Sequence, residues 1–230
     1  MRARRMRVLP MISLSINAEL KRVLPGLALG CITAKVTAEK HNELLWREID
    51  QHLAHLTATI KPDQINTVPQ IAAMRNAYKA LGKDPSRYRG SAEALLRRVL
   101  SGKGLYQINN LVDINNLVSL ESFQSLGVYD LEQLNGPVEL RIGAAGESYK
   151  GIGKDLINIE NLPVFADALG AFGSPTSDSD RAMVRPESGN VMMVIFSFTG
   201  AEELGPWMAR ASNLLQLYAA GGQVESKSVV

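Results

Sequence analysis

Hydrophobic and polar positions alternate at the start of the chain and then take up helical spacing. The alternation predicts a strand over residues 11–16, and the apolar run at residues 27–36 predicts a second, buried strand. Between them, Asn17 is placed to cap a short helix, and Pro25 with Gly26 forms the turn into the second strand.

Four longer segments show the spacing of amphipathic helices. They are residues 38–56, a helix that stops at Gly82, a helix capped by Ser91 and a closing helix at residues 206–220. Their predicted buried faces consist of Leu45, Ile49, Leu53 and Leu56; Ile71, Met74, Tyr78 and Leu81; Leu95, Leu96 and Val99; and Trp207, Ala211, Leu214 and Tyr218.

Short runs with strand character lie at residues 138–142, 156–159, 164–166 and 191–198. Together with the helices they predict an α+β fold with a mixed, partly barrel-like β-sheet core and surrounding helices. The expected parts are a disordered basic tail (1–10), an N-terminal α/β part (11–66), a module (67–222) and a disordered tail (223–230). A polar linker at residues 61–67 either separates the two folded parts or joins them within one domain.

Composition narrows the class of protein. With 230 residues, 46% of them hydrophobic, the chain can bury a full core. Its single cysteine, Cys31, excludes a disulfide framework and suits a reducing cytoplasm, where we expect the protein. No segment approaches the roughly 20 apolar residues that span a bilayer, so we expect no membrane span. The opening is basic, but Pro10 and Asn17 break its apolar continuation, so we expect no secretory signal.

Positive charge is concentrated in residues 75–103. This segment contains eight basic side chains and two acidic ones, Asp84 and Glu93, so its local net charge is +6. With Tyr78 and Tyr88 interleaved, this block can follow a phosphate backbone and stack on bases. The alternative is an ordinary solvated helix face. The basic residues are Arg75, Lys79, Lys83, Arg87, Arg89, Arg97, Arg98 and Lys103.

Residues 170–181 read G-A-F-G-S-P-T-S-D-S-D-R and lie between two apolar segments. Gly170 and Gly173 let a ligand approach the main chain, and the hydroxyl and carboxylate side chains supply hydrogen-bonding groups. The segment is therefore either a ligand-binding loop or a solvated connection of the same composition. A second unusual segment, residues 107–130, places Asn109, Asn110, Asn115 and Asn116 in an apolar helix, where each must bond neighbouring loops or face a polar ligand.

These two segments together resemble the B-three/B-four tRNA-editing module of the phenylalanyl-tRNA synthetase β-subunit. The module's N-N-V-V-D-V-T-N-Y-V is close to N-N-L-V-D-I-N-N-L-V, in which Asn116 falls at an editing-pocket asparagine, and its G-V-M-G-G is matched at residues 170–174. Its T-x-x-T-x-N motif is similar, more loosely, to residues 185–191. Residues 75–98 are similar to the lead-in of free-standing proteins that lack the aminoacylation machinery. The resemblance covers residues 70–200.

The resemblance implies the location of an editing pocket and its substrate class, an amino acid esterified to the end of a tRNA. The implied pocket residues are Asn110, Asn116, Gly127, Gly170, Gly173, Thr176, Ser179, Arg181 and Val194. The tRNA contacts expected from the charge of residues 75–103 are Arg75, Lys79, Arg87, Arg89, Arg97 and Arg98. Gly127 stands where the module has a pocket histidine, and Val194 where it has a specificity glutamate. We therefore expect a larger, more apolar pocket without tyrosine selectivity.

Catalytic groups are few. No histidine follows His55, so a Ser-His-Asp site cannot form within the module, and the glycine loop lacks the lysine of a Walker motif. Hydrolysis of an aminoacyl ester would rest on Ser174, on backbone amides near it, and on Asp178 or Asp180 as a general base. His52 and His55 can share a metal, but His41 lies about 16 Å further along the helix, so we expect no metal site and no cofactor.

The sequence thus predicts a tRNA-binding protein that clears mischarged aminoacyl-tRNA in trans. The alternative is a non-catalytic module that binds an RNA end or an amino acid. A complete synthetase is not expected, because 230 residues cannot also hold the catalytic domain. The expected partner is the aminoacylated end of tRNA, with no membrane and no obligate protein partner.

Overall fold

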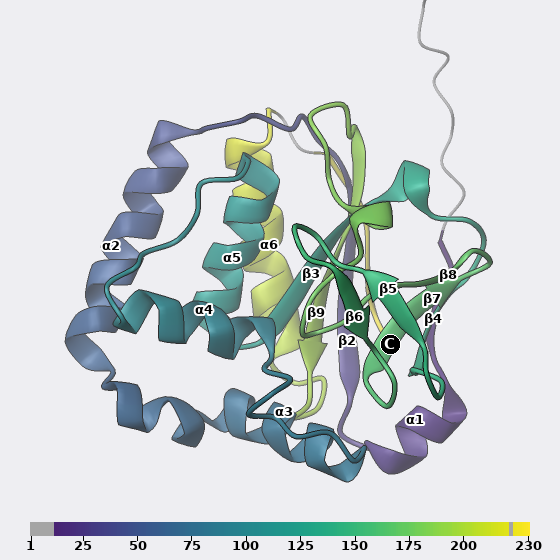
Figure 1. The fold of residues 1–230 in the computed structure, drawn as a ribbon. Helices are drawn as coiled ribbons and strands as arrows, with labels where there is room; N and C mark the ends of the chain where they lie inside the picture. Colours follow the sequence, from purple (N-terminus) through teal and green to yellow (C-terminus); the bar gives the residue numbers. More distant parts are fainter. Residues whose placement is uncertain (1–11, 221–222) are drawn as a thin grey trace, which may run out of the picture.

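Helices and sheets are mixed along the chain in a computed structural model that describes residues 12–220 and 223–230 (Figure 1). The expected tail at residues 1–10 and the glycine pair at 221–222 lie outside the described residues. The helices are α1 (Ala18–Val23), α2 (Glu43–Thr59), α3 (Pro69–Ala80), α4 (Ser91–Leu100), α5 (Asn110–Ser122) and α6 (Leu204–Tyr218). Short 3-10 turns are η1 (Pro62–Thr67), η2 (Leu131–Gln133) and η3 (Asp180–Ala182).

The strands form three sheets. They are β1 (Leu14–Ile16), β2 (Ala28–Lys35), β3 (Ser125–Asp130), β4 (Val138–Ile142), β5 (Ser148–Lys150), β6 (Leu156–Asn158), β7 (Pro163–Asp167), β8 (Gly170–Gly173), β9 (Asn190–Ser197) and β10 (Gln223–Val229). The central sheet has the order β10-β2-β9-β3 and is antiparallel throughout, whereas the second sheet, β1-β4-β7-β8, pairs β1 with β4 in parallel. A β5-β6 hairpin stands alone. The predicted α+β class is confirmed, and across the described residues the sheets stay open and form no closed barrel.

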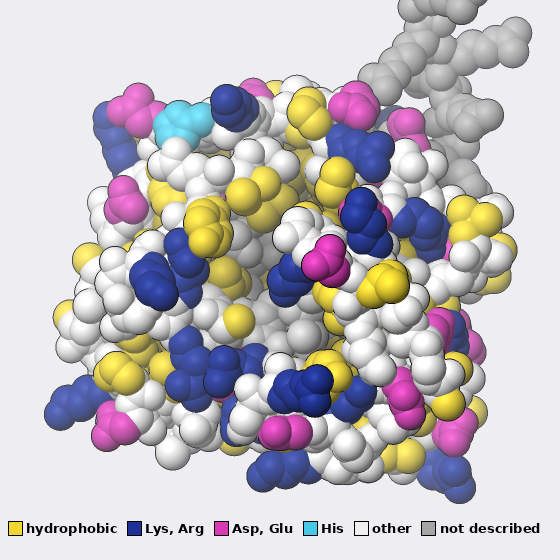
Figure 2. Space-filling model, in the orientation of Figure 1, with side chains coloured by type: hydrophobic (Ala, Val, Ile, Leu, Met, Phe, Trp, Pro, Cys, Tyr) yellow, Lys and Arg dark blue, Asp and Glu magenta, His cyan; other side chains and the backbone are white. Residues whose placement is uncertain are grey.

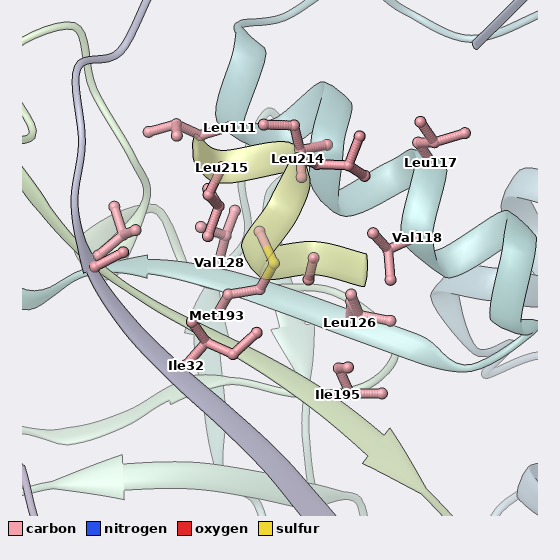
Figure 3. Packing of buried hydrophobic residues seen from close by; sticks show 14 of the residues in the cluster. Ile32, Leu111, Leu117, Val118, Leu126, Val128, Met193, Ile195, Leu214 and Leu215 are labelled. Atoms are coloured by element: carbon pink, nitrogen blue, oxygen red, sulfur yellow. The ribbon is translucent and has the colours of Figure 1, made fainter. Parts of the chain in front are cut away.

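The central sheet lies between a layer of helices and the second sheet (Figure 1). Along β9, Val191, Met193 and Ile195 belong to the hydrophobic cluster on the helix side, and the alternate residues belong to the cluster on the side of the second sheet. This is the period of two that a strand buried on both faces requires. Figure 3 shows the helix side, where leucines of α5 and α6 pack over β2, β3 and β9.

Asparagine caps fix two helix starts. The Asn17 side chain accepts a 3.0 Å hydrogen bond from the Glu19 amide and begins α1 as predicted. The predicted start of the next helix at residue 38 is too early, because the Asn42 side chain accepts from Leu45 N at 3.1 Å and begins α2 there. The cap of α4 is Gly90 rather than Ser91.

Two segments have more regular structure than the sequence predicts. Gly170–Gly173, expected to be a loop, is the edge strand β8 and pairs with β7. The tail at 223–230 was expected to be disordered, but Gln223–Val229 pairs with β2 as β10, and Val230 exchanges backbone hydrogen bonds of 3.0 Å with Leu29. Because β2 lies between β10 and β9, the N-terminal part and the module share one sheet.

Candidate functional site

Three buried tyrosine hydroxyls converge on the loop at residues 173–178, called the 173–178 loop below. Tyr78 of α3 shares a 2.8 Å hydrogen bond with Thr176 Oγ1. Tyr129 of β3 donates to Asp178 Oδ1 at 2.8 Å, and Tyr149 of β5 donates to Ser174 Oγ at 3.1 Å. The loop is thus held from three separate elements.

The Tyr129 ring fills the space beside two of the predicted pocket glycines. A Cβ atom at Gly127 would lie 2.2 Å from the Tyr129 hydroxyl oxygen, and one at Gly173 would lie 2.5 Å from it. Val194 is fully buried in the core between the sheets. The expectation of a larger pocket at Gly127 and Val194 is therefore wrong, because a tyrosine two residues along β3 occupies the space that the missing side chain leaves.

Asp178 has the most unusual environment in the loop. Its Oδ1 accepts hydrogen bonds from the Tyr129 hydroxyl at 2.8 Å and from the Ser174 amide at 3.2 Å. Desolvation raises the pKa of this carboxyl to about 7, although these two bonds and the charge of Lys154 act in the opposite direction. No hydrogen bond from a described residue ends on Oδ2, and the residue is only half-buried, so Oδ2 is the atom left for solvent or a ligand.

Tyr129 remains a hydrogen-bond donor at all ordinary pH values. Burial, together with the nearby Asp178 charge, raises the pKa of its hydroxyl well above the usual range. Burial likewise raises the pKa of Tyr149. Both phenols are therefore protonated near neutral pH, and the Tyr129 hydroxyl donates its hydrogen bond to Oδ1 of Asp178.

The other two predicted catalytic residues are engaged in structural contacts. The buried Ser174 hydroxyl donates to Ser177 O at 2.9 Å and accepts from Ser177 N at 3.2 Å, which closes the 173–178 loop. The Ser174 amide, a predicted oxyanion donor, is used by Asp178. Asp180 forms an ion pair with Lys150 at 3.1 Å. Of the three residues, Asp178 has the geometry best suited to exchanging a proton with a ligand.

Several predicted pocket residues tie the fold together. Asn110 is fully buried; its side chain accepts from Glu39 N at 2.8 Å and donates to Thr37 O at 3.0 Å and Tyr218 O at 2.8 Å. Such bonds satisfy a buried amide without a ligand.

Arg181 and Ser179 form a second structural group. Arg181 binds both carboxylate oxygens of Asp167, at 2.9 and 3.1 Å, and donates to Gly170 O at 3.0 Å. The Ser179 hydroxyl accepts from the Arg181 amide at 3.2 Å. These contacts fix the turn between β7 and β8. They give the Arg181 and Ser179 side chains hydrogen-bond partners within the protein, without a ligand.

Asn116 and the glycines lie in different layers. Asn116 is half-buried on α5, which packs on the helix side of the central sheet, whereas Gly170 and Gly173 belong to β8 in the second sheet. The layers meet beside β3, the last strand of the central sheet. Figure 2 shows a hollow there, between α4 and the β5-β6 hairpin. A pocket shared by Asn116 and the glycines stays a prediction.

Lysine and arginine side chains gather around this hollow and over α3 and α4 (Figure 2). Inside the basic block, the buried carboxylate of Glu93 is bound by Arg75 at 3.0 Å, by Arg97 at 2.8 Å and more loosely by Arg89 at 3.8 Å. Three of the eight basic side chains of the block are therefore engaged by one internal carboxylate, which the net charge of +6 already includes. Tyr78, predicted to stack on bases, is 1% exposed and cannot do so.

Lys79 and Arg87 differ from these arginines. Both are exposed, and neither forms an ion pair with a described residue. Arg87 lies over the Tyr88 ring, 5.7 Å from its centroid, and Lys83 lies over the same ring at 4.3 Å. Among the predicted tRNA contacts, Lys79 and Arg87 are thus the ones most available to a phosphate backbone.

The described residues contain neither a membrane-spanning helix nor a metal-binding cluster. None of the helices in the described part of the chain is both long and apolar enough to cross a bilayer. Within residues 12–220 and 223–230, no group of three or more His, Cys, Asp and Glu side chains is arranged to hold a metal ion. The His52 and His55 rings lie 6.4 Å apart on α2.

Comparison with known proteins identifies the family. The B3/4 domain matches residues 73–205, more than half of the chain, so the protein belongs to the B3/4 domain family. No curated protein matches. A solved structure that is similar is an N-terminal fragment of the phenylalanyl-tRNA synthetase β-subunit from Pyrococcus horikoshii, with a TM-score of 0.47 and 10% identity over 96% of this chain. This chain covers 55% of that fragment.

Proposed function

We propose that this B3/4 domain protein binds the aminoacylated end of tRNA and hydrolyses mischarged aminoacyl esters in trans. Family membership supports the substrate class, since a B3/4 domain is what the chain matches over residues 73–205. The observation that carries the reaction is Asp178, a carboxyl with a pKa of about 7 and with one oxygen that accepts no hydrogen bond from the described residues. A general base works best when its pKa lies near the working pH.

In the proposed reaction, Oδ2 of Asp178 takes a proton from a water molecule as the water oxygen attacks the ester carbonyl. The bond between that carbonyl carbon and the ribose oxygen then breaks, and Asp178 returns the proton to the ribose oxygen. Tyr129 and the Ser174 amide hold Oδ1 throughout and so position the carboxyl. The products are a free amino acid and an uncharged tRNA.

The experiment measures ester loss from a panel of mischarged tRNAs with the wild type and the Asp178→Asn variant. Asparagine keeps an oxygen for the two hydrogen bonds but cannot accept a proton at the other position, so we expect a loss of about 10²- to 10⁴-fold in rate. Asp180→Asn, at an ion-paired surface carboxylate, is the matched control and should retain the rate. Equal rates for wild type and Asp178→Asn would remove Asp178 from the mechanism.

A non-catalytic binding module is the second candidate. The observation that favours it is the Tyr129 ring, which occupies the space beside Gly127 and Gly173 where the predicted pocket would open. Under this alternative the wild type binds tRNA but leaves every ester in the panel intact. The same deacylation experiment therefore separates the two functions.

A further inference from the structure

One aromatic side chain is unusually exposed. Tyr106 lies in the segment between α4 and α5 and is 64% exposed; it is the sole aromatic residue among the large exposed hydrophobic side chains of the described part of the chain. Nearby, Ile108 is 51% exposed. Large aromatic residues dominate the energetics of interfaces when a partner covers them. An exposed aromatic ring that the surrounding residues hold in place therefore indicates a contact site.

A cation covers one face of the Tyr106 ring. The guanidinium carbon of Arg98 lies 3.7 Å from the ring centroid, the distance of direct stacking. Arg98 is half-buried and also donates to Lys103 O at 3.3 Å, which fixes the guanidinium at the end of α4. Tyr106 is 64% exposed although Arg98 covers one face of its ring, so the opposite face of the ring is the one open to solvent.

The segment that carries Tyr106 is anchored at its far end. The Ile108 amide donates to Asp113 Oδ1 at 3.2 Å, and Oδ2 of the same carboxylate accepts from Trp46 Nε1 at 2.8 Å. Asn109 then caps α5 by accepting from Val112 N at 2.9 Å. A ring held on a pinned segment loses little conformational freedom when a partner stacks on it.

We propose that Tyr106 and Arg98 form a stacking platform for an unpaired base of single-stranded RNA. Both residues lie inside the family match at residues 73–205. Arg98 belongs to the basic block, and Tyr106 follows the end of that block at Lys103, so charge and aromatic surface are adjacent. Unpaired bases stack on aromatic rings and guanidinium planes, and the neighbouring phosphates interact with Lys and Arg. The inference rests on the proposed function in that the RNA end is taken to be the single-stranded end of tRNA.

The test titrates a fluorescent single-stranded RNA ending in CCA against wild type, Tyr106→Ala and Tyr106→Phe. Losing a stacked ring should weaken binding by about 5- to 100-fold, whereas phenylalanine keeps the ring and should bind within about 2-fold of wild type. Leu44→Ala, at an exposed apolar residue of α2, is the control for loss of surface area and should bind as wild type. In Tyr106→Trp, added RNA should quench tryptophan emission beyond any change in wild type.

Wild-type affinity in Tyr106→Ala, or no binding of single-stranded RNA by wild type, would overturn the platform. An equal loss for fully double-stranded RNA would also overturn it, because paired bases offer no free face to stack. Ester hydrolysis is measured separately on wild type. Wild type that hydrolyses no ester refutes the proposed reaction, whereas active wild type with an unaffected Tyr106→Ala variant refutes only the platform.

Discussion

Replacing Asp178 with Asn should change how the stability of the protein depends on pH. The carboxyl has a pKa of about 7 in the folded protein and an ordinary value of 3.8 when the chain is unfolded. Between these two pH values the folded state holds a proton that the unfolded state has lost. The wild type therefore loses stability as pH rises through this interval and levels off above about pH 7.

The magnitude follows from the size of the pKa difference. Each pH unit within the interval is worth about 1.4 kcal/mol, so the full difference corresponds to about 4 kcal/mol as an upper value. Because Asp178 is half-buried, solvent screens part of this effect, and we expect about 2 to 4 kcal/mol. The Asn side chain keeps the hydrogen bonds at Oδ1 and carries no charge at any pH.

The assay is urea unfolding of both proteins at pH 4, 5, 6, 7 and 8. All other titrating groups are shared, so they cancel when the free energies of unfolding are subtracted. The free energy of unfolding of the wild type should fall relative to that of Asp178→Asn up to about pH 7. Above that pH the two curves should run parallel. Parallel curves over the whole range would show that the Asp178 carboxyl is not desolvated and would remove the basis for its role as a general base.

Three further predictions test the packing and the charged surface. Glu93→Gln should cost about 2 to 4 kcal/mol in urea unfolding, because it leaves arginines around a buried site without their carboxylate; an unchanged midpoint would show that the pairs contribute nothing. Gly127→Ala should cost about 1 to 3 kcal/mol through its clash with a tyrosine, whereas Gly189→Ala, which has open space, should cost little; equal costs would contradict the close packing. Removing the positive charges of both Lys79 and Arg87 should weaken tRNA binding and reduce the slope of log affinity against log salt concentration by about 1 to 2. An unchanged slope would show that these side chains contact no phosphate and contribute only to solubility.

Local patterns in the sequence determined most of the elements. The strand predicted at residues 138–142 is β4, with the same bounds, because alternating burial on a strand is visible in sequence. The Asn17 cap and the buried face of α3 are local features of the same kind. The motifs at residues 109–118 and 170–174 also indicated the family, and the match over residues 73–205 confirms it.

Two edge strands were missed because their short sequences lack a clear strand pattern, and pairing with a neighbouring strand decides their place. β10 reads Q-V-E-S-K-S-V and lacks the apolar alternation of a half-buried strand; its place is decided by the free edge of β2. β8 is rich in glycine, which favours a loop in isolation, and it becomes a strand because β7 supplies hydrogen-bonding partners.

The candidate site was decided mainly by tertiary structure. The sequence pointed to Asp178, but the Tyr129 hydroxyl that binds it lies 49 residues earlier, and no local pattern links the two. The desolvation that raises the Asp178 pKa likewise arises only when the chain is folded. Composition gave the charge of the basic block, whereas only folding showed that Glu93 is buried among its arginines and that Tyr78 is hidden. Side-chain type is local information, but burial and partners depend on which distant segments the folded core brings together.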